Sequence, residues 1–279
     1  MIIDFHTHIF PPNVIKDRSR YIQADPCFAA LYSDKTAKLA TTEELIASMD
    51  EDGIDISVAL NIGWSTHKLC VETNDYILES INRYPKRLVG FGAVQPNSLN
   101  SALKEIERLA KGGIKGIGEM RPDIQQIVLN NRKIMHSFVQ ALKQHGLILL
   151  THASEPVGHQ YQGKGALTPE LIYEFITDHP GVPVVLAHWG GGLPFYALMP
   201  EVKRAMSDVY FDTAASPFLY NPQIYKQVSQ MVGAEKILFG TDYPLLKQAR
   251  AVEEVKTAGL AAKDRDLILA GNARRLLGM

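Results

Sequence analysis

Residues 2–8 read Ile2-Ile3-Asp4-Phe5-His6-Thr7-His8, a short apolar run that ends in two histidines. Seven further runs of this kind follow, rich in Val, Ile, Leu and Phe and bounded by polar or glycine-rich residues. They do not alternate between apolar and polar positions, which is typical of strands buried on both faces. We therefore predict eight buried strands: Met1–His6, Ser57–Ile62, Leu88–Val94, Ile114–Met120, Leu147–His152, Val182–His188, Val209–Asp212 and Ile237–Gly240.

Segments with a helical pattern fill the intervals between these strands. The first begins at Thr42-Glu43-Glu44, with a hydroxyl cap and early acidic residues, and several others end at Gly or before Pro. The regular alternation predicts the α/β class, a parallel (β/α)8 TIM barrel with residues 1–279 in a single domain. The predicted helices are Thr42–Gly53, Asn74–Tyr84, Ser101–Ala110, Asn131–His145, Pro169–Asp178, Pro222–Val232, Lys247–Ala258 and Asp264–Leu277.

One connection is longer than this scheme needs. About thirty residues separate His8 from the first helix, and a structureless loop of this length is uncommon unless it covers a site. We therefore interpret Ile9–Ala40 as a candidate lid; it carries Arg18, Arg20, Tyr21 and Tyr32.

The composition excludes several classes of function. The chain has 29 basic and 30 acidic residues, and no long run of one sign predicts a nucleic-acid or membrane surface. The N-terminal apolar stretch is interrupted at once by Asp4, His6 and His8, unlike a signal peptide or a membrane span. Cys27 and Cys70 are too few for a disulfide framework. We expect a cytoplasmic protein with a small-molecule substrate, and the sequence leaves a homo-oligomer open.

Metal-binding types of side chain stand at the ends of five predicted strands. Barrel enzymes carry their sites at the C-terminal ends of the strands. Imidazole and carboxylate groups together suit zinc, manganese, iron or nickel, and a catalytic site keeps one position for water. The sequence thus predicts a divalent-metal centre, with zinc as the first choice and one or two ions. Its predicted ligands are His6, His8, Glu119, His152, His188 and Asp242.

Each of these residues also has an ordinary structural interpretation. Two histidines two apart occur often by chance, Glu119 fits an ion pair with Arg121, and Asp242 after Gly240-Thr241 fits a turn. A coincidence of all six at one rim is improbable, so we favour the site.

Several segments together resemble a known family, the amidohydrolase superfamily. Within it, they are most similar to the amidohydrolase-related group that includes aminocarboxymuconate semialdehyde decarboxylase. The resemblance implies that His6, His8, His152 and Asp242 hold a metal, with His188 beside the metal-bound water or on a second metal. The segments are Asp4-Phe5-His6-Thr7-His8-Ile9-Phe10-Pro11, Thr151-His152, Leu186-Ala187-His188-Trp189-Gly190-Gly191, Phe239-Gly240-Thr241-Asp242-Tyr243-Pro244 and Gly271-Asn272-Ala273.

Glu119 departs from the decarboxylase pattern and decides our expectation of the reaction. In the wider superfamily this position carries a carboxylated lysine or a glutamate that bridges two metals in hydrolases. We therefore expect a hydrolase of an amide, ester or lactone, with Asp242 moving the proton of the metal-bound water and His188 orienting that water or polarising the carbonyl. The alternative is a non-oxidative decarboxylase or hydratase of an unsaturated or aromatic carboxylic acid. A barrel that binds a ligand without turnover is the weakest of the three.

Four residues just past strand ends are candidates for substrate contact: Arg121, Trp64, Trp189 and Tyr243. A carboxylate on the substrate would give Arg121 a bidentate partner. The glycines after Trp189 fit a close-packed turn equally well.

Overall fold

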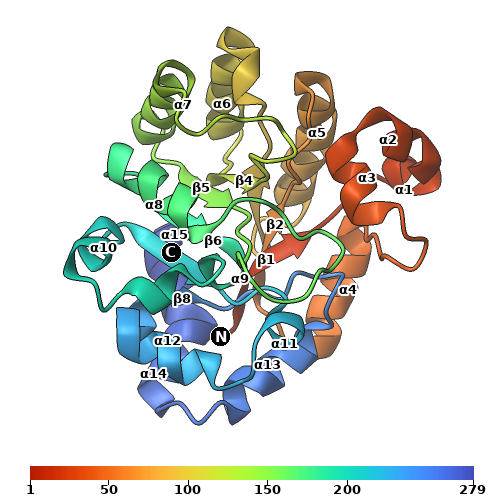
Figure 1. Ribbon diagram of the computed structural model, residues 1–279. Helices are drawn as coiled ribbons and strands as arrows, with labels where there is room; N and C mark the ends of the chain where they lie inside the picture. The colour runs from red at the N-terminus through yellow and green to blue at the C-terminus, as the bar shows by residue number, and fades with distance from the viewer.

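The computed structural model describes residues 1–279 and contains one eight-stranded sheet. Its strands are all parallel and follow one another in chain order around the molecule (Figure 1). This arrangement confirms the predicted barrel and all eight predicted strands. Their bounds are β1 Ile3–His8, β2 Ile56–Leu60, β3 Leu88–Gly92, β4 Gly116–Met120, β5 Ile148–Thr151, β6 Val184–Leu186, β7 Val209–Asp212 and β8 Ile237–Leu238.

The segment after β8 brings the last strand against the first. The Phe5 N–H donates to the Phe239 carbonyl at 2.7 Å, and the Asp242 N–H donates to the His6 carbonyl at 2.9 Å. A parallel bridge also joins Thr7 to Tyr243. Because β8 itself is only two residues long, these bonds are what place Asp242 beside the end of β1.

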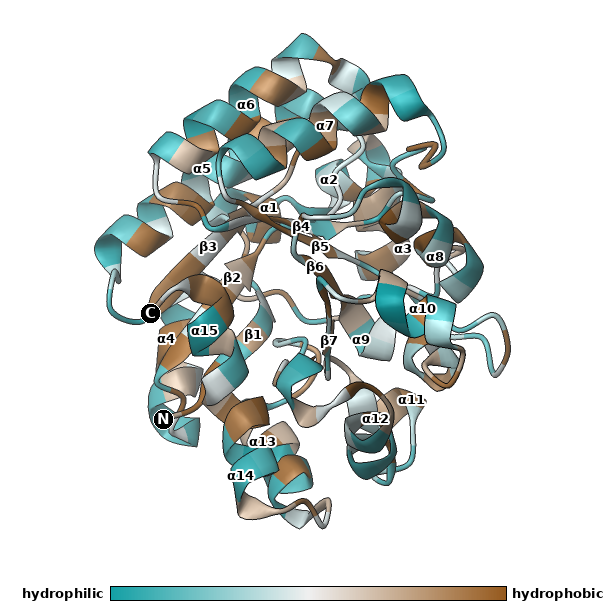
Figure 2. Cartoon of the chain, turned by 90° about the vertical axis from the view of Figure 1, so that its left-hand side faces the viewer, coloured by the Kyte–Doolittle hydropathy of each residue, from teal (hydrophilic) through white to brown (hydrophobic).

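Helices surround the strands. Figure 2 shows apolar, brown strands at the centre and helices on which apolar and polar positions alternate. The main helices between strands are α4 Thr42–Asp52, α5 His67–Arg83, α6 Asn100–Lys111, α7 Arg132–Gln144, α8 Pro169–Asp178, α12 Ile224–Val232 and α13 Gln248–Thr257. The shorter ones are α9 Ala187–Gly190, α10 Pro200–Ala205, α11 Ser216–Leu219, α14 Ala262–Asp266 and α15 Asn272–Leu277.

Helix α4 shows how local sequence sets these boundaries. The Thr41 hydroxyl accepts the Glu44 N–H while the Glu44 carboxylate accepts the Thr41 N–H, which is a capping box. Gly53 ends the helix in the left-handed conformation (φ 71°) that glycine adopts at no steric cost.

Three predictions about the helices are wrong. The segment Ile9–Ala40 is not structureless, because it contains α1 Pro12–Lys16, α2 Arg18–Ala24 and α3 Pro26–Tyr32. Helix α5 begins at His67, seven residues before the predicted start, because the Thr66 hydroxyl caps it. The last predicted helix is divided into α14 and α15 by a π-helical segment, Leu267–Gly271.

Two strands carry an irregularity next to the predicted site. Three steps along β1, from Asp4 to Thr7, pair with two steps along β2, and β4 shows the same mismatch between Ile117 and Met120. Such β-bulges re-aim side chains and are common beside active sites. The bulged stretches contain His6 and Glu119, so the local backbone of these two residues is not that of a regular strand.

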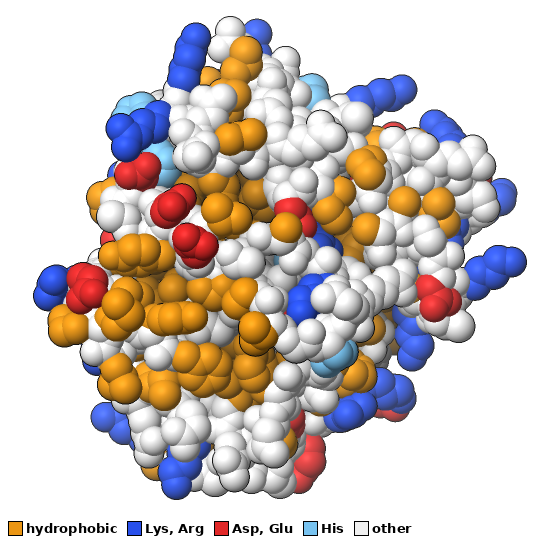
Figure 3. All heavy atoms as spheres, viewed as in Figure 1, with side chains coloured by type: hydrophobic (Ala, Val, Ile, Leu, Met, Phe, Trp, Pro, Cys, Tyr) orange, Lys and Arg blue, Asp and Glu red, His pale blue; other side chains and the backbone are white.

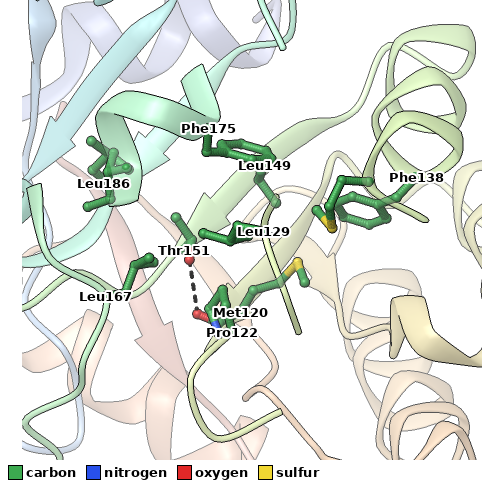
Figure 4. Close-up of a pocket in the computed structure, with 11 residues that line it drawn as sticks. Met120, Pro122, Leu129, Phe138, Leu149, Thr151, Leu167, Phe175 and Leu186 are labelled. Atoms are coloured by element: carbon green, nitrogen blue, oxygen red, sulfur yellow. Dashed lines mark hydrogen bonds between the residues drawn. The ribbon is translucent and has the colours of Figure 1, made fainter. Parts of the chain in front are cut away.

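Apolar side chains fill both sides of the sheet. Inside the barrel, Phe5 of β1 meets Phe91 of β3 edge-to-face, with ring centroids 5.7 Å apart, although the two strands are not neighbours. Outside it, Met120 and Thr151 point between the strands and α7 and α8, where they line an apolar space of about 20 Å³ with Phe138 and Phe175 (Figure 4). The chain neighbours of Glu119 and His152 therefore lie on the outer side of the sheet.

Apolar side chains also gather on part of the surface. In Figure 3 they form a patch over the region of α10 and α12, to which the segment before α10 contributes exposed Phe195, Tyr196, Leu198 and Met199. No helix in the chain is both long enough and apolar enough to cross a membrane.

Candidate metal centre

The six predicted metal-binding residues converge at the C-terminal ends of the strands. Five of them are buried, and the Asp242 side chain is 17% exposed. Ligand-type atoms of five of them, all except Asp242, form two groups close enough together to hold a metal ion, and Glu119 belongs to both. One group contains His6, His8 and Glu119; the other contains Glu119, His152 and His188.

We call His6, His8 and the neighbouring Asp242 the β1 half of the centre. The Nε2 atoms of His6 and His8 are 3.1 Å apart. Asp242 Oδ1 lies 3.6 Å from the first of these nitrogens and 3.4 Å from the second. Glu119 Oε2 approaches the same two nitrogens at 3.9 and 3.6 Å.

We call His152 and His188 the β5–β6 half of the centre. Glu119 Oε1 lies 2.9 Å from His152 Nδ1 and 3.4 Å from His188 Nε2. The two oxygens of one carboxylate thus face different halves. Glu119 is the only side chain placed in both groups.

Contacts on the far side of each ring decide which nitrogen faces the centre. His6 Nδ1 lies 2.8 Å from Asp212 Oδ2, and His188 Nδ1 lies 3.1 Å from the Ala214 carbonyl oxygen. Both partners only accept, so each Nδ1 carries a proton, and the ring in its neutral form directs an Nε2 lone pair inward. His152 is turned the other way, with Nε2 3.0 Å from Ser154 Oγ and Nδ1 toward Glu119.

These contacts test whether a cation fits. Two carboxylates and several imidazole lone pairs meet in a buried space that contains no Lys or Arg ion pair to either carboxylate. So many acceptors repel one another unless protons or a cation lie between them. His8 Nδ1 is also buried without a hydrogen-bond partner. Imidazole and carboxylate donors around one point suit a divalent transition metal, so the residues fit such an ion.

The pKa values follow from the same charges. Burial alone would lower the pKa of His6, but Asp212, with Glu119 and Asp242, raises it to about 10. Burial would raise the pKa of Asp242, yet His8 and the other nearby histidines lower it to about 2. For His152, burial and the charge of Arg121 lower the pKa. In the metal-free protein, protons on the β1 half therefore balance the carboxylates.

Asp212, the last residue of β7, was missed in the sequence. It is fully buried, and its Oδ2 holds the His6 ring. Its Oδ1 accepts the N–H groups of His188 and Ala214, both at 3.0 Å. One carboxylate therefore positions a ring of the β1 half and the backbone of the β5–β6 half. The available signal was an acidic residue at the end of an apolar strand.

The backbone that carries His188 is a left-handed turn. His188, Trp189 and Gly190–Gly192 all have positive φ, between 56° and 92°. A Cβ on Gly191 would lie 2.5 Å from the Ser154 carbonyl oxygen, so this position has no room for a side chain. The turn thus packs against the residue whose hydroxyl holds His152, which links the two rings of the β5–β6 half.

The predicted substrate-contact residues have different surroundings. Trp64 is fully buried, donates to Asn61 Oδ1 and stacks on Phe28. Trp189 is fully buried and donates to Ser216 Oγ. The Tyr243 hydroxyl donates to the Glu44 carbonyl on α4. These three side chains have structural partners within the fold, whereas Arg121 is buried near His152.

The segment after β5, residues 153–168, lies between the centre and a surface cavity. At one end the Gly165 N–H donates to Ser154 Oγ at 2.8 Å, and at its outer side the segment lines a cavity of about 310 Å³. Among the lining residues are His159, Tyr161, Lys164, Phe195 and Tyr220. Gly191 and Gly192, in the left-handed turn after His188, also line this cavity.

Comparison with known proteins identifies relatives along the whole chain. A family profile described as amidohydrolase matches residues 3–279. A 2-amino-3-carboxymuconate-6-semialdehyde decarboxylase from Dictyostelium discoideum is 23% identical, over 99% of this chain and 91% of the relative. A 6-methylsalicylic acid decarboxylase from Penicillium expansum is 24% identical, over 87% of this chain and 84% of the relative. The resemblance expected from the sequence is thereby confirmed.

A solved structure shows the same fold. It is 5-carboxyvanillate decarboxylase from Novosphingobium aromaticivorans, complexed with manganese and 4-hydroxy-3-methoxy-5-nitrobenzoic acid. The two structures superimpose with a TM-score of 0.82 at 19% identity, over 100% of this chain and 96% of the other.

These findings contradict the expected hydrolase activity. The relatives named above are decarboxylases, although Glu119 had favoured hydrolysis. The physical reason is that a set of ligands fixes the cation and its charge but not the bond that is broken. A Lewis acid that activates water also withdraws electrons from a carboxylate-bearing ring.

Proposed function

We propose that this chain, which belongs to the amidohydrolase family, is a metal-dependent non-oxidative decarboxylase of a small aromatic or unsaturated carboxylic acid. The main support from the site itself is that the two oxygens of Glu119 face two different pairs of histidines at the barrel mouth. The reaction is supported by the named activities of the relatives.

The β1 half with Glu119 would hold a divalent cation, and the β5–β6 half offers a second position on the other oxygen of Glu119. When bound, such a cation supplies a Lewis acid for the oxygen atoms of the substrate. Manganese is our first choice, because the Novosphingobium relative holds it, and zinc suits the same donors.

The reaction requires one proton at a carbon atom. Decarboxylation breaks the bond between that carbon and the carboxylate, leaves the electron pair on the carbon, and releases CO₂. Asp242 Oδ1 is the group placed to move the proton, beside both histidines of the β1 half. Because the pKa of Asp242 is about 2, this carboxylate starts ionised, takes a proton from a substrate hydroxyl or from water, and delivers it to the carbon.

His188 orients the substrate from the opposite side. Its Nδ1 proton is held by the Ala214 carbonyl, so the ring keeps a fixed direction with Nε2 toward Glu119. The buried surroundings exclude bulk water, which strengthens the interaction between these groups and the charge that develops on the substrate.

The test is CO₂ release from a panel of acids. Purified protein is stripped with a chelator, reloaded with Mn²⁺ or Zn²⁺, and its bound metal is measured. It is then incubated with 5-carboxyvanillate, 6-methylsalicylate, 2,6-dihydroxybenzoate and 2-amino-3-carboxymuconate semialdehyde. We expect metal-dependent CO₂ release from at least one acid, and its loss in Asp242→Asn with metal still bound. Metal-loaded protein that leaves every acid intact, or that hydrolyses esters or lactones instead, would contradict the proposal.

A further inference from the structure

Arg121 is a buried cation without an anionic partner. It follows β4 directly, is 1% exposed and takes part in none of the ion pairs of the chain. Its Nη2 donates to the Gly163 carbonyl at 2.6 Å, and its Nε is buried with no hydrogen-bond partner. A charge in such a place is costly unless another group completes its contacts.

The guanidinium borders the metal centre. Arg121 lies two residues after Glu119, and its guanidinium also comes close to His152. A Cβ atom added to Gly165 would lie 3.0 Å from Arg121 Nη2 and 3.2 Å from His152 Cδ2. The same point is 2.6 Å from Asp123 Oδ2, so a molecule bound beside the β5–β6 half would reach the guanidinium here, with the Asp123 carboxylate beside it.

The carbonyl that now meets Arg121 belongs to the segment 153–168. This segment crosses the barrel mouth toward α3, where Gln162 Nε2 donates to the Leu31 carbonyl at 3.0 Å (Figure 1). Its Lys164 Nζ donates back to the Val157 carbonyl at 3.0 Å, so its loop closes on itself. The Gly163 carbonyl thus holds one donor of Arg121 with a neutral oxygen, where a carboxylate oxygen would bind more strongly.

Asp123 is an acidic residue on the connection after β4, close to Arg121 in the chain, and its carboxylate accepts a backbone N–H group. Its Oδ2 accepts the Ala166 N–H at 2.9 Å, and its Oδ1 is buried without a partner. Neither oxygen of Asp123 comes within 4.0 Å of a guanidinium nitrogen of Arg121, so the two side chains form no ion pair.

We propose that Arg121 binds an anionic group that the substrate keeps through the reaction, so that the preferred substrates carry a second carboxylate besides the one released. This inference rests on the proposed function. A cation that bound the departing carboxylate would stabilise the reactant more than the transition state, because that group loses its charge as CO₂ forms. A guanidinium therefore assists decarboxylation only when it holds a group whose charge persists.

A pair of unreactive ligands tests this subsite without turnover. One is 4-hydroxy-3-methoxy-5-nitrobenzoate, which retains a carboxylate, and the other is 2-methoxy-6-nitrophenol, the same ring without it. Calorimetry of the Mn²⁺-loaded protein gives the ratio of the two affinities. We expect the carboxylate to strengthen binding about 10- to 100-fold, as hydrogen bonds to a charged group do. In Arg121→Met the ratio should fall toward one, and in Arg121→Lys it should fall partway, because lysine lacks the bidentate fork.

Controls separate binding from structure. Metal content and thermal unfolding are measured for each variant, and Asp123→Asn removes the neighbouring acid. If Arg121 is a structural partner of Asp123, then Asp123→Asn and Arg121→Lys lower the melting temperature alike and leave the affinity ratio unchanged, which overturns the subsite. A ratio near one in the wild-type protein overturns it as well. Because no turnover is involved, a ratio that depends on Arg121 stands even if no acid is decarboxylated.

Discussion

Different structural elements position the side chains of the two halves of the centre. The β1 half takes both histidines from one buried strand, and a fully buried carboxylate, Asp212, fixes the His6 ring. The β5–β6 half takes its rings from the ends of two strands, where a left-handed turn and the hydroxyl of Ser154 orient them. The β1 half is held by a strand and by the charge of Asp212, and the β5–β6 half is held by packing between loops. We expect the first to bind metal more tightly.

Glu119→Gln should have the largest effect, because it removes the charge that both halves share. We expect the bound metal to fall by at least one ion per chain. Since residues that only orient a ligand cost about 10- to 100-fold, loss of this ligand should cost at least about 100-fold in kcat. Metal analysis of the dialysed protein, together with CO₂ release, measures both.

Glu105→Gln is the matched control for Glu119→Gln, since it neutralises a buried acid on α6 that binds Asn74 and Arg108. It should lower stability and leave metal content intact. Unchanged metal content in Glu119→Gln would show that the two halves do not share this carboxylate.

Asp212→Asn should come next. Asparagine offers one acceptor oxygen where Asp212 uses two, for the His6 ring and for the N–H groups of His188 and Ala214. We expect a metal affinity weaker by about 10- to 100-fold. If Asp212 only supports the barrel, the variant will unfold more readily while its titrated metal affinity matches that of the wild type.

Burial and barrel geometry made the strands and most of the metal centre predictable from the sequence. Strands buried on both faces must be apolar, and parallel strands in a barrel end at one rim, so His6, Glu119, His152 and Asp242 were expected to lie together. The reaction was not predictable in this way, because the same ligands serve more than one chemistry. The choice of hydrolysis rested on Glu119, and the named activities of the relatives contradict it.

The remaining differences come from contacts that only the fold creates. The bulges in β1 and β4 depend on pairing with neighbouring strands, which the pattern of residues does not show. The helices α1–α3 are five to seven residues long, too short for a helical period, although Pro12 and Pro26 mark where two of them begin. Asp212 was not selected because no motif surrounds it.

The pH dependence of metal affinity should distinguish the two halves. Where metal binding releases one proton, the affinity should rise by about tenfold per pH unit. With its pKa raised to about 10, the His6 ring is doubly protonated at pH 8 in the metal-free protein and must lose a proton to bind metal. The affinity of the β1 half should therefore rise with pH until about pH 10. Against the effect of burial, Glu119 and Asp242 raise the pKa of His188, whereas the pKa of His152 is lowered. In a His188→Asn background, the β5–β6 half should therefore show no such rise above neutral pH. Calorimetry in buffers of different ionisation enthalpy counts the protons, and two equal slopes would contradict the comparison.

Gly191→Ala should have the smallest effect and should act on one half only. The backbone at this position is left-handed (φ 59°), a conformation that costs a residue with a Cβ about 1–2 kcal/mol. The added Cβ would also lie 2.5 Å from the Ser154 carbonyl oxygen. Gly53→Ala, at φ 71° with no atom within 4 Å, imposes the first cost without the second. The extra destabilisation of Gly191→Ala over Gly53→Ala in urea unfolding therefore measures the collision alone.

Because Ser154 holds His152, the same collision in Gly191→Ala should weaken metal binding at the β5–β6 half by less than about tenfold and leave binding at the β1 half unchanged. Equal weakening of both positions would mean that the turn supports the whole centre, and that the two halves are not independently built.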